Sequence, residues 1–180
     1  AAGAALNLAD RDGVTPLLYA FERRDAPHAE HDLRDTDEVL RFLADFTAHP
    51  YPYVKYAQST VRHFDFGGME NVSATTLTDR TLHPAEWEPV KSSRGLVAHE
   101  AAHQWFGDLI TCRSWPHIWL NEGFATYGEA LHAERALGAD AFALAMRGTR
   151  DGALGAFDGD RRPIVWDRWA DPFDLFNGHA

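Results

Sequence analysis

The chain has 180 residues, an apolar content of 45% and a net charge of −10 at neutral pH. This length and composition indicate a globular protein with a sizeable core, and the acidic balance argues against binding to nucleic acid or to anionic membranes. Cys112 is the single cysteine, which excludes an intrachain disulfide, and no apolar run approaches the roughly 20 residues of a membrane span.

The first half of the chain is predicted to consist mainly of strands. Apolar residues at helical spacing predict one helix there, which begins at Asp35 or Thr36 and ends near residue 48. Gly67 and Gly68 are expected to break the second strand. The predicted strands are residues 14–22, 58–66 and the threonine-rich segment 72–82.

The second half is predicted to be helical. One helix begins at Ser92 or Ser93 and ends at Gly107, and Gly138 separates the next two. Strands that come first and helices that follow predict an α+β domain. The later helices cover residues 118–137 and 139–150, and the glycine- and aspartate-rich residues 151–163 are predicted to form a loop.

The sequence HEAAH at residues 99–103 predicts a metal site. Positions four apart on a helix lie on one face, so His99 and His103 can bind one ion together. Glu100 lies beside them and can reach a metal-bound water without itself being a ligand. The alternative is a helix whose histidines are ordinary core or surface groups. By contrast, His28 and His31 are interpreted as part of a solvated loop.

A catalytic zinc ion usually takes three protein ligands and a water, so a further donor is expected. Glu122, in the segment WLNEGFA, is a candidate because a second helix could present its first turn to the first one. Glu129 lies two turns further on, on nearly the same face. It could accept the other ring N–H of a ligand histidine, or it could be a solvated helix residue.

Three motifs occur in order: GGMEN at 67–71, HEAAH at 99–103 and WLNEGFA at 119–125. Together they resemble the zinc aminopeptidase family that includes aminopeptidase N, whose pattern is Gly-x-Met-Glu-Asn, then HExxH, then a glutamate ligand. The resemblance extends over about residues 34–137. It implies the α+β catalytic domain of a thermolysin-like zinc metallopeptidase.

The resemblance implies one Zn²⁺ ion held by His99, His103 and Glu122. Zinc lowers the pKa of a bound water to about 7, which makes a nucleophile at neutral pH. Glu100 is expected to take the proton from that water and to pass it to the leaving amine. The resemblance predicts that the chain removes N-terminal residues from peptides.

The resemblance also assigns GGMEN to the substrate. The segment is expected to lie along the peptide as an edge strand, where glycine permits a close approach. Glu70 matches the family glutamate that binds the free α-amino group, so the expected partner is a peptide with a free N-terminus. Taken alone, GGMEN would be only a turn followed by an acidic residue. The expected substrate-binding residues are Gly67, Gly68, Met69, Glu70 and Asn71.

The family's oxyanion-stabilising tyrosine is expected just past residue 180, and Tyr127 does not match its position. Residues 1–180 are therefore predicted to be a partial catalytic domain, incomplete at its C-terminal end. The family's N-terminal β-rich and C-terminal helical domains, absent here, would be partners of this chain. The alternatives are a thermolysin-type endopeptidase, an epoxide hydrolase side activity, or a zinc-binding fragment without turnover of its own. The compartment stays open, with a soluble, cytoplasmic location favoured.

Overall fold

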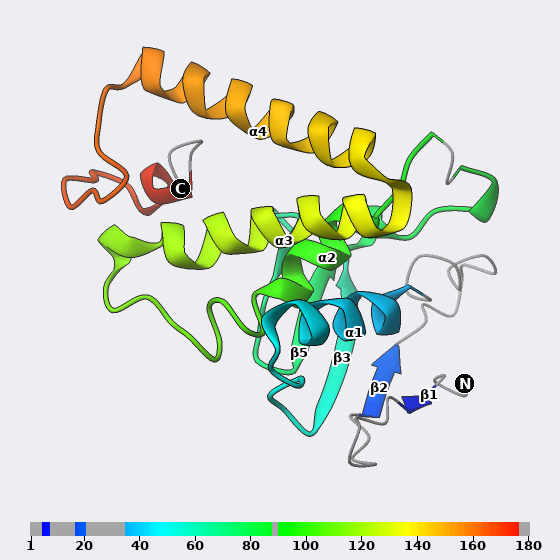
Figure 1. The fold of residues 1–180 in the computed structure, drawn as a ribbon. Helices are drawn as coiled ribbons and strands as arrows, with labels where there is room; N and C mark the ends of the chain where they lie inside the picture. The colour runs from blue at the N-terminus through cyan, green and yellow to red at the C-terminus, as the bar shows by residue number, and fades with distance from the viewer. Residues whose placement is uncertain (1–4, 8–16, 21–34, 88–89, 177–180) are drawn as a thin grey trace.

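The computed structural model describes residues 5–7, 17–20, 35–87 and 90–176, so His28 and His31 lie outside the described residues. Within these ranges five strands form one sheet, and helices lie along one of its faces (Figure 1). The strands are Ala5–Asn7 (β1), Leu17–Ala20 (β2), Lys55–Val61 (β3), Gly68–Met69 (β4) and Ala74–Thr78 (β5). The α-helices are Thr36–Thr47 (α1), Arg94–Ala102 (α2), Trp119–Leu137 (α3) and Ala139–Gly159 (α4). Short 3₁₀ helices cover Asp79–Thr81, Ala85–Trp87, Trp115–His117 and Pro172–Phe176. This combination confirms the α+β class.

The sheet is mixed and has the strand order β1-β2-β3-β5-β4. The central pairs β2/β3 and β3/β5 are parallel, whereas β1 and β4 are antiparallel to their neighbours. Strand β4 therefore lies at an edge, as the GGMEN segment was expected to do. Gly67 and Gly68 were expected to break the strand predicted at 58–66, but β3 already ends at Val61, and Gly68 itself pairs with Leu77.

The predicted strands differ from the observed ones in their bounds. Strand β3 begins at Lys55 and ends at Val61, where its pairing with β5 stops, and His63 then takes a left-handed conformation with φ 58°. Strand β5 is shorter than residues 72–82, because Ser73 also has a positive φ of 60° and a 3₁₀ helix begins at Asp79. The described part of the first predicted strand is β2.

Helix α1 has nearly the predicted bounds, but the residue before it, Asp35, does not cap the helix with its side chain. Asp35 occupies the N-cap position without a capping hydrogen bond, and its carboxylate instead lies 2.7 Å from Nε of Arg94 at the start of α2. Helix α2 ends at Ala102 rather than at Gly107, because the chain makes a series of turns after it. Gly107, with φ 140°, lies in those turns.

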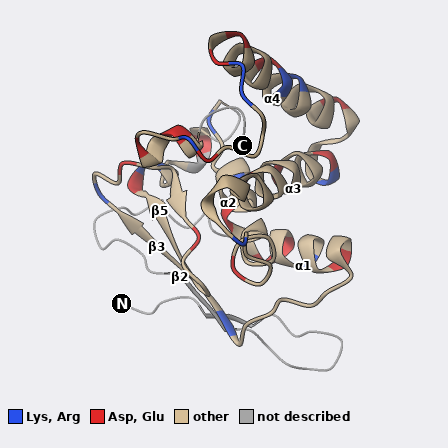
Figure 2. Cartoon of the chain, turned by 90° about the vertical axis from the view of Figure 1, so that its left-hand side faces the viewer, with Lys and Arg blue, Asp and Glu red and all other residues tan. Residues whose placement is uncertain are grey.

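Helix α3 ends where Gly138 was predicted to end it, at a φ of 96°. Helix α4 continues to Gly159, so the prediction of a loop at 151–163 was wrong for its first part. Each glycine in a helix costs only about 1 kcal/mol relative to alanine, and the intervening alanines and leucine are good helix formers. Helix α4 lies on the side of α3 away from α1 (Figures 1 and 2). No helix in the described ranges is both long enough and apolar enough to cross a membrane.

The core lies between the sheet and α1, α2 and α3. Helix α2 is buried in its middle, and a Cβ added to Gly128 of α3 would lie 3.0 Å from Cβ of Ala102. Small side chains therefore let α2 and α3 pack closely. Trp105 fills the space beyond the end of α2 and donates its indole N–H to the carbonyl of His49 (3.1 Å). The core consists of Val39, Leu40, Leu43, Tyr56, Leu77, Val97, Ala98, Ala101, Ala102, Trp105 and Ala125.

Replacing Leu43, which is 1% exposed, by alanine tests this core. Leu43→Ala is expected to lower the free energy of unfolding by about 2–5 kcal/mol, because it removes buried methyl groups and leaves a cavity. The matched control is Leu144→Ala on α4, where the side chain is 63% exposed, and its effect should stay within about 0.5 kcal/mol. Equal effects in urea denaturation would contradict the described core.

Candidate metal centre

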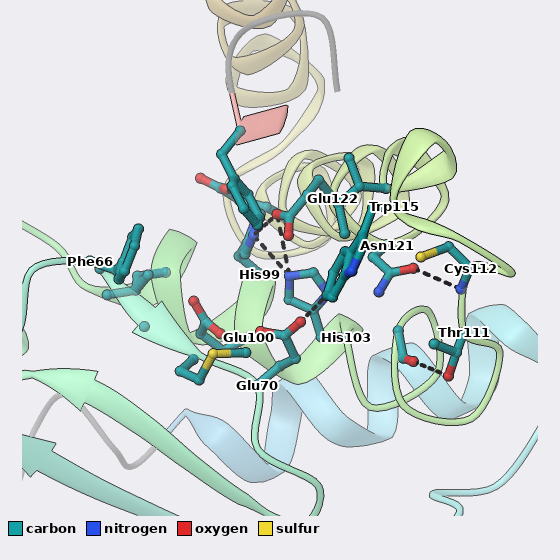
Figure 3. Close-up of a pocket in the computed structure, with 18 of the residues that line it drawn as sticks. Phe66, Glu70, His99, Glu100, His103, Thr111, Cys112, Trp115, Asn121 and Glu122 are labelled. Atoms are coloured by element: carbon teal, nitrogen blue, oxygen red, sulfur yellow. Dashed lines mark hydrogen bonds and ion pairs between the residues drawn. The ribbon is translucent and has the colours of Figure 1, made fainter. Parts of the chain in front are cut away.

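Helices α2 and α3 bring three side chains with metal-binding atoms together (Figure 3). The Nε2 atoms of His99 and His103 lie 3.2 Å apart. Oε2 of Glu122 lies 3.4 Å from Nε2 of His99 and 3.6 Å from Nε2 of His103. All three residues line a cavity of about 1020 Å³, so their converging atoms are open to a ligand.

The local fold explains this convergence. The amide of His103 still donates to the carbonyl of His99 (3.3 Å), so the two rings keep the spacing of one helical turn. Glu122 lies in the first turn of α3. Because α3 packs closely against α2 through Gly128 and Ala102, that first turn faces the two rings.

Hydrogen bonding decides which ring nitrogen of His103 is free. Its Nδ1 lies 3.1 Å from the carbonyl oxygen of Phe106. A carbonyl only accepts, so Nδ1 donates this bond and Nε2 is the nitrogen that faces the donor cluster. On the other ring, Nδ1 of His99 lies 3.8 Å from Oε2 of Glu129. The carboxylate reaches this place because Gly95 has no side chain: a Cβ there would lie 2.6 Å from Oε1 of Glu129.

Opposite charges in the cluster shift the pKa values of Glu122 and His103. Burial by itself raises the pKa of Glu122, but its interactions with His103 and His99 outweigh this and lower the pKa to about 2. Burial by itself lowers the pKa of His103, but its interaction with Glu122 and the charges of Glu70 and Glu100 raise it to about 9. A carboxylate and an imidazolium therefore stabilise each other in this cavity.

Glu100 lies beside these three donors. Its side chain is buried, and Oε2 has no hydrogen-bond partner among the described residues. Burial raises the pKa of Glu100 to about 7, although the charges of His99 and His103 oppose the shift. The carboxyl rests against the backbone of β4, where a Cβ on Gly68 would lie 2.3 Å from Oε1. A group with this pKa can both accept and donate a proton at neutral pH.

Glu70 follows β4 and faces the same cavity (Figure 3). Its Oε1 lies 3.9 Å from Nδ1 of His103. Asn71, by contrast, does not line the cavity, and its Oδ1 accepts a hydrogen bond from the hydroxyl of Thr76 (3.0 Å). Four of the five residues expected to contact substrate therefore line the cavity: Gly67, Gly68, Met69 and Glu70.

Sequence reasoning missed part of the cavity wall. A loop after α2 lines the cavity and is tied to α3, because the amide of Cys112 donates to Oδ1 of Asn121 (3.2 Å). Neither periodicity nor composition marked this loop. Gln104 was also missed, although it directly follows HEAAH and is completely buried. The additional wall residues include Phe66, Leu96, Thr111, Cys112, Arg113, Ser114, Trp115 and Phe176.

The described residues contain a second group that could hold a metal, formed by Glu70, Glu100 and His103. It shares His103 with the first group. This second group is the weaker candidate for a metal site, because Nδ1 of His103, the nitrogen near Glu70, is hydrogen-bonded to the Phe106 carbonyl. The group of His99, His103 and Glu122 offers three atoms without that competition.

Two imidazoles, a carboxylate and an adjacent buried glutamic acid are the groups that zinc-dependent hydrolases use. Comparison with known proteins agrees with this class. The profile of the Peptidase family M1 domain matches residues 31–154, and the chain belongs to this family.

Similar proteins include human aminopeptidase N, which is 39% identical over 118 residues, or 62% of this chain and 12% of that protein. Dog aminopeptidase N is 40% identical over 119 residues, or 62% of this chain and 12% of that protein. Human endoplasmic reticulum aminopeptidase 1 is 37% identical over 123 residues, or 66% of this chain and 13% of that protein. The chain thus spans about an eighth of the length of these relatives, and the resemblance to the zinc aminopeptidase family is confirmed.

The raised pKa of Glu100 has a consequence for stability without metal. The folded state binds this proton more tightly than the unfolded state, where the ordinary value is 4.5. Stability is therefore lost as the pH rises from about 4.5 to about 7. The Glu100→Gln variant has no such carboxyl and does not lose this stability. When the metal is removed with a chelator, its free energy of unfolding relative to wild type should therefore be about 1–3 kcal/mol higher at pH 8 than at pH 4.5.

Urea denaturation at both pH values measures this difference. The matched control is Glu134→Gln, an exposed position on α3, which should change stability little at either pH. If Glu100→Gln shows no gain at pH 8, the carboxyl is not buried as described.

Proposed function

We propose that residues 1–180 are part of the catalytic domain of a zinc-dependent aminopeptidase, which removes N-terminal residues from peptides. Membership of the M1 family supports this assignment, as does the similarity to proteins named aminopeptidase N and endoplasmic reticulum aminopeptidase 1. One structural observation carries it: the donor atoms of His99, His103 and Glu122 have the spacing of a zinc site, and Glu100 and Glu70 line the same cavity.

The fit to zinc is quantitative. Tetrahedral ligands at zinc-to-ligand distances of about 2.0–2.1 Å lie about 3.3–3.4 Å from one another. The three distances between Nε2 of His99, Nε2 of His103 and Oε2 of Glu122 are 3.2, 3.4 and 3.6 Å. These residues would hold one Zn²⁺ ion, and Glu129 would orient His99 by accepting its Nδ1–H. Bound there, zinc would activate a water and polarise the substrate carbonyl.

Glu100 would move the protons of the reaction. Its carboxylate accepts a proton from the attacking water as the water oxygen bonds to the peptide carbonyl carbon. The same carboxyl then donates that proton to the amide nitrogen as the C–N bond breaks, which releases an amine and a carboxylic acid. A pKa of about 7 suits both transfers at neutral pH.

Glu70 would select substrates with a free N-terminus. Its side chain faces the cavity and is 17% exposed, so little water competes with a substrate ammonium for its charge. Gly67, Gly68 and Met69 would lie along the peptide, with β4 as the edge strand that accepts it. Asn71 would act indirectly, by bracing the turn through Thr76.

Three alternatives have the same metal centre. A thermolysin-type endopeptidase would use the same zinc and Glu100 but needs no carboxylate at Glu70. An epoxide hydrolase side activity would use the same zinc. A zinc-binding fragment without turnover of its own would bind the metal and catalyse nothing. Zinc content and hydrolysis of aminoacyl substrates with free or acetylated amines distinguish the aminopeptidase, the endopeptidase and the zinc-binding fragment.

Glu100→Gln is expected to bind zinc normally and to lower kcat by about 10²–10⁴-fold, since the amide cannot accept the proton. Metal analysis and hydrolysis of a chromogenic aminoacyl substrate measure the two effects. His99→Ala is the contrasting variant, because it should lose zinc and turnover together. Near-normal turnover in Glu100→Gln would exclude the proposed proton transfer.

Glu70→Ala is expected to lower kcat/KM for free-amine substrates by about 10–100-fold, because the substrate ammonium loses a charged partner. Zinc content should be unchanged, and N-acetylated substrates should be cleaved poorly by both proteins. Glu86→Ala, at an exposed position outside the cavity, serves as the matched control. Efficient cleavage of N-acetylated substrates by the wild type would instead favour an endopeptidase.

A further inference from the structure

The side-chain amide of Gln104 is completely buried and uses all four of its strong hydrogen-bonding positions. Its Nε2 donates to the backbone carbonyl of Glu70 (3.1 Å) and to Oδ2 of Asp108 (2.8 Å). Its Oε1 accepts from the amide of Ser73 (2.9 Å) and from the hydroxyl of Tyr51 (3.0 Å). A buried amide that is fully satisfied is fixed in one orientation.

These bonds hold the start of a turn that lies beyond the β4/β5 pairing, whereas its end is also held by β3, because the amide of Ala57 donates to the carbonyl of Ser73 (3.0 Å). The pairing of β4 with β5 ends at Met69 and Thr76, one residue before Glu70. Gln104 then contacts the backbone on both sides of the following turn, at Glu70 and at Ser73. The backbone that carries the Glu70 carboxylate is thus attached to the chain directly after α2.

Because of its place in the sequence, Gln104 connects the segment that carries Glu70 to the metal-binding residues. Gln104 directly follows His103, whose ring is fixed by the Phe106 carbonyl. The metal-binding histidine and the holder of Glu70 are therefore neighbours on one rigid piece of backbone. An aminopeptidase needs a fixed distance between its amine anchor and its metal, because the α-amino nitrogen and the scissile carbonyl carbon are separated by a single carbon atom.

We propose that Gln104 is a positioning residue, which sets the place of the Glu70 carboxylate relative to the metal and so determines recognition of the substrate α-ammonium. This inference rests on the proposed function. The competing explanation is that Gln104 only stabilises the fold. Gln58 on β3 provides the comparison, because it is also a buried glutamine but bonds to Tyr56 and Thr36, away from Glu70.

The experiment measures recognition of the amine without relying on turnover. The probes are leucine hydroxamate and its analogue without the amino group, 4-methylpentanoyl hydroxamate, both bound to the zinc-loaded protein. The hydroxamate group binds zinc in both probes, so the ratio of the two Kd values isolates the contribution of the amine. The variants are Gln104→Met, which removes all four bonds, and Gln104→Glu, which cannot make both donor bonds, to the Glu70 carbonyl and to Asp108.

The wild type should bind the amino probe at least tenfold more tightly than its analogue, as expected for one charged hydrogen bond. Both Gln104 variants should lose about tenfold of this preference while they keep their zinc and their affinity for the analogue, since a small misplacement of a binding group is costly. Gln58→Met should lower Tm and keep the preference. If Gln104→Met does not fold, Gln104→Glu alone tests the positioning role.

The outcomes separate the two proposals. A wild-type preference near one would overturn the amine anchor and with it the proposed function. A clear wild-type preference that both Gln104 variants retain would overturn the positioning role alone. Equal loss of preference in Gln58→Met would also overturn it, because the effect would then follow general stability.

Discussion

Helix α2 carries ionisable side chains through the buried centre of the molecule, and the rest of the site depends on how their charges are compensated. His103 and Glu100 are almost completely buried, where unpaired charge is costly. Glu122 supplies the compensating carboxylate from α3, and Glu129 adds a second one near His99. The close packing of α2 against α3, through Ala102 and Gly128, is what makes these contacts possible.

The buried Glu100 side chain also explains why a glycine lies in the edge strand β4. Strand β4 is only two residues long, and Gly68 lets its backbone rest against the Glu100 carboxyl. A longer side chain would separate the strand from the helix. The absence of a Cβ therefore brings β4 into contact with the Glu100 carboxyl, and Gln104 continues that connection beyond the end of the strand. The residues proposed to bind the metal, to transfer the proton and to anchor the amine are thus connected through α2 and the turn that follows it.

Much of the site was predictable because its residues are local in sequence. The one-turn spacing of His99 and His103 follows from helix geometry, and the type of fold follows from strands that precede helices. The bounds of the elements were less predictable. Glycines at 152, 155 and 159 suggested a loop but lie in α4, because helix propensity is a weak signal when neighbours favour the helix. The ends of β3 depended on its partner strand, which periodicity does not reveal.

The sequence by itself determined the chemistry of the cluster: two imidazoles, a nearby carboxylate and a glutamic acid beside them, together with the family that arranges them in this order. Only the tertiary structure decided which atoms meet. It set the direction of the His103 ring through the Phe106 carbonyl and placed Glu129 in the space left by Gly95. It also bonded Gln104 to the nearby Asp108 and to two distant segments, at Tyr51 and at the turn that contains Glu70 and Ser73. The physical reason is that ligand types are properties of residues, whereas distances, burial and pKa values are properties of packing.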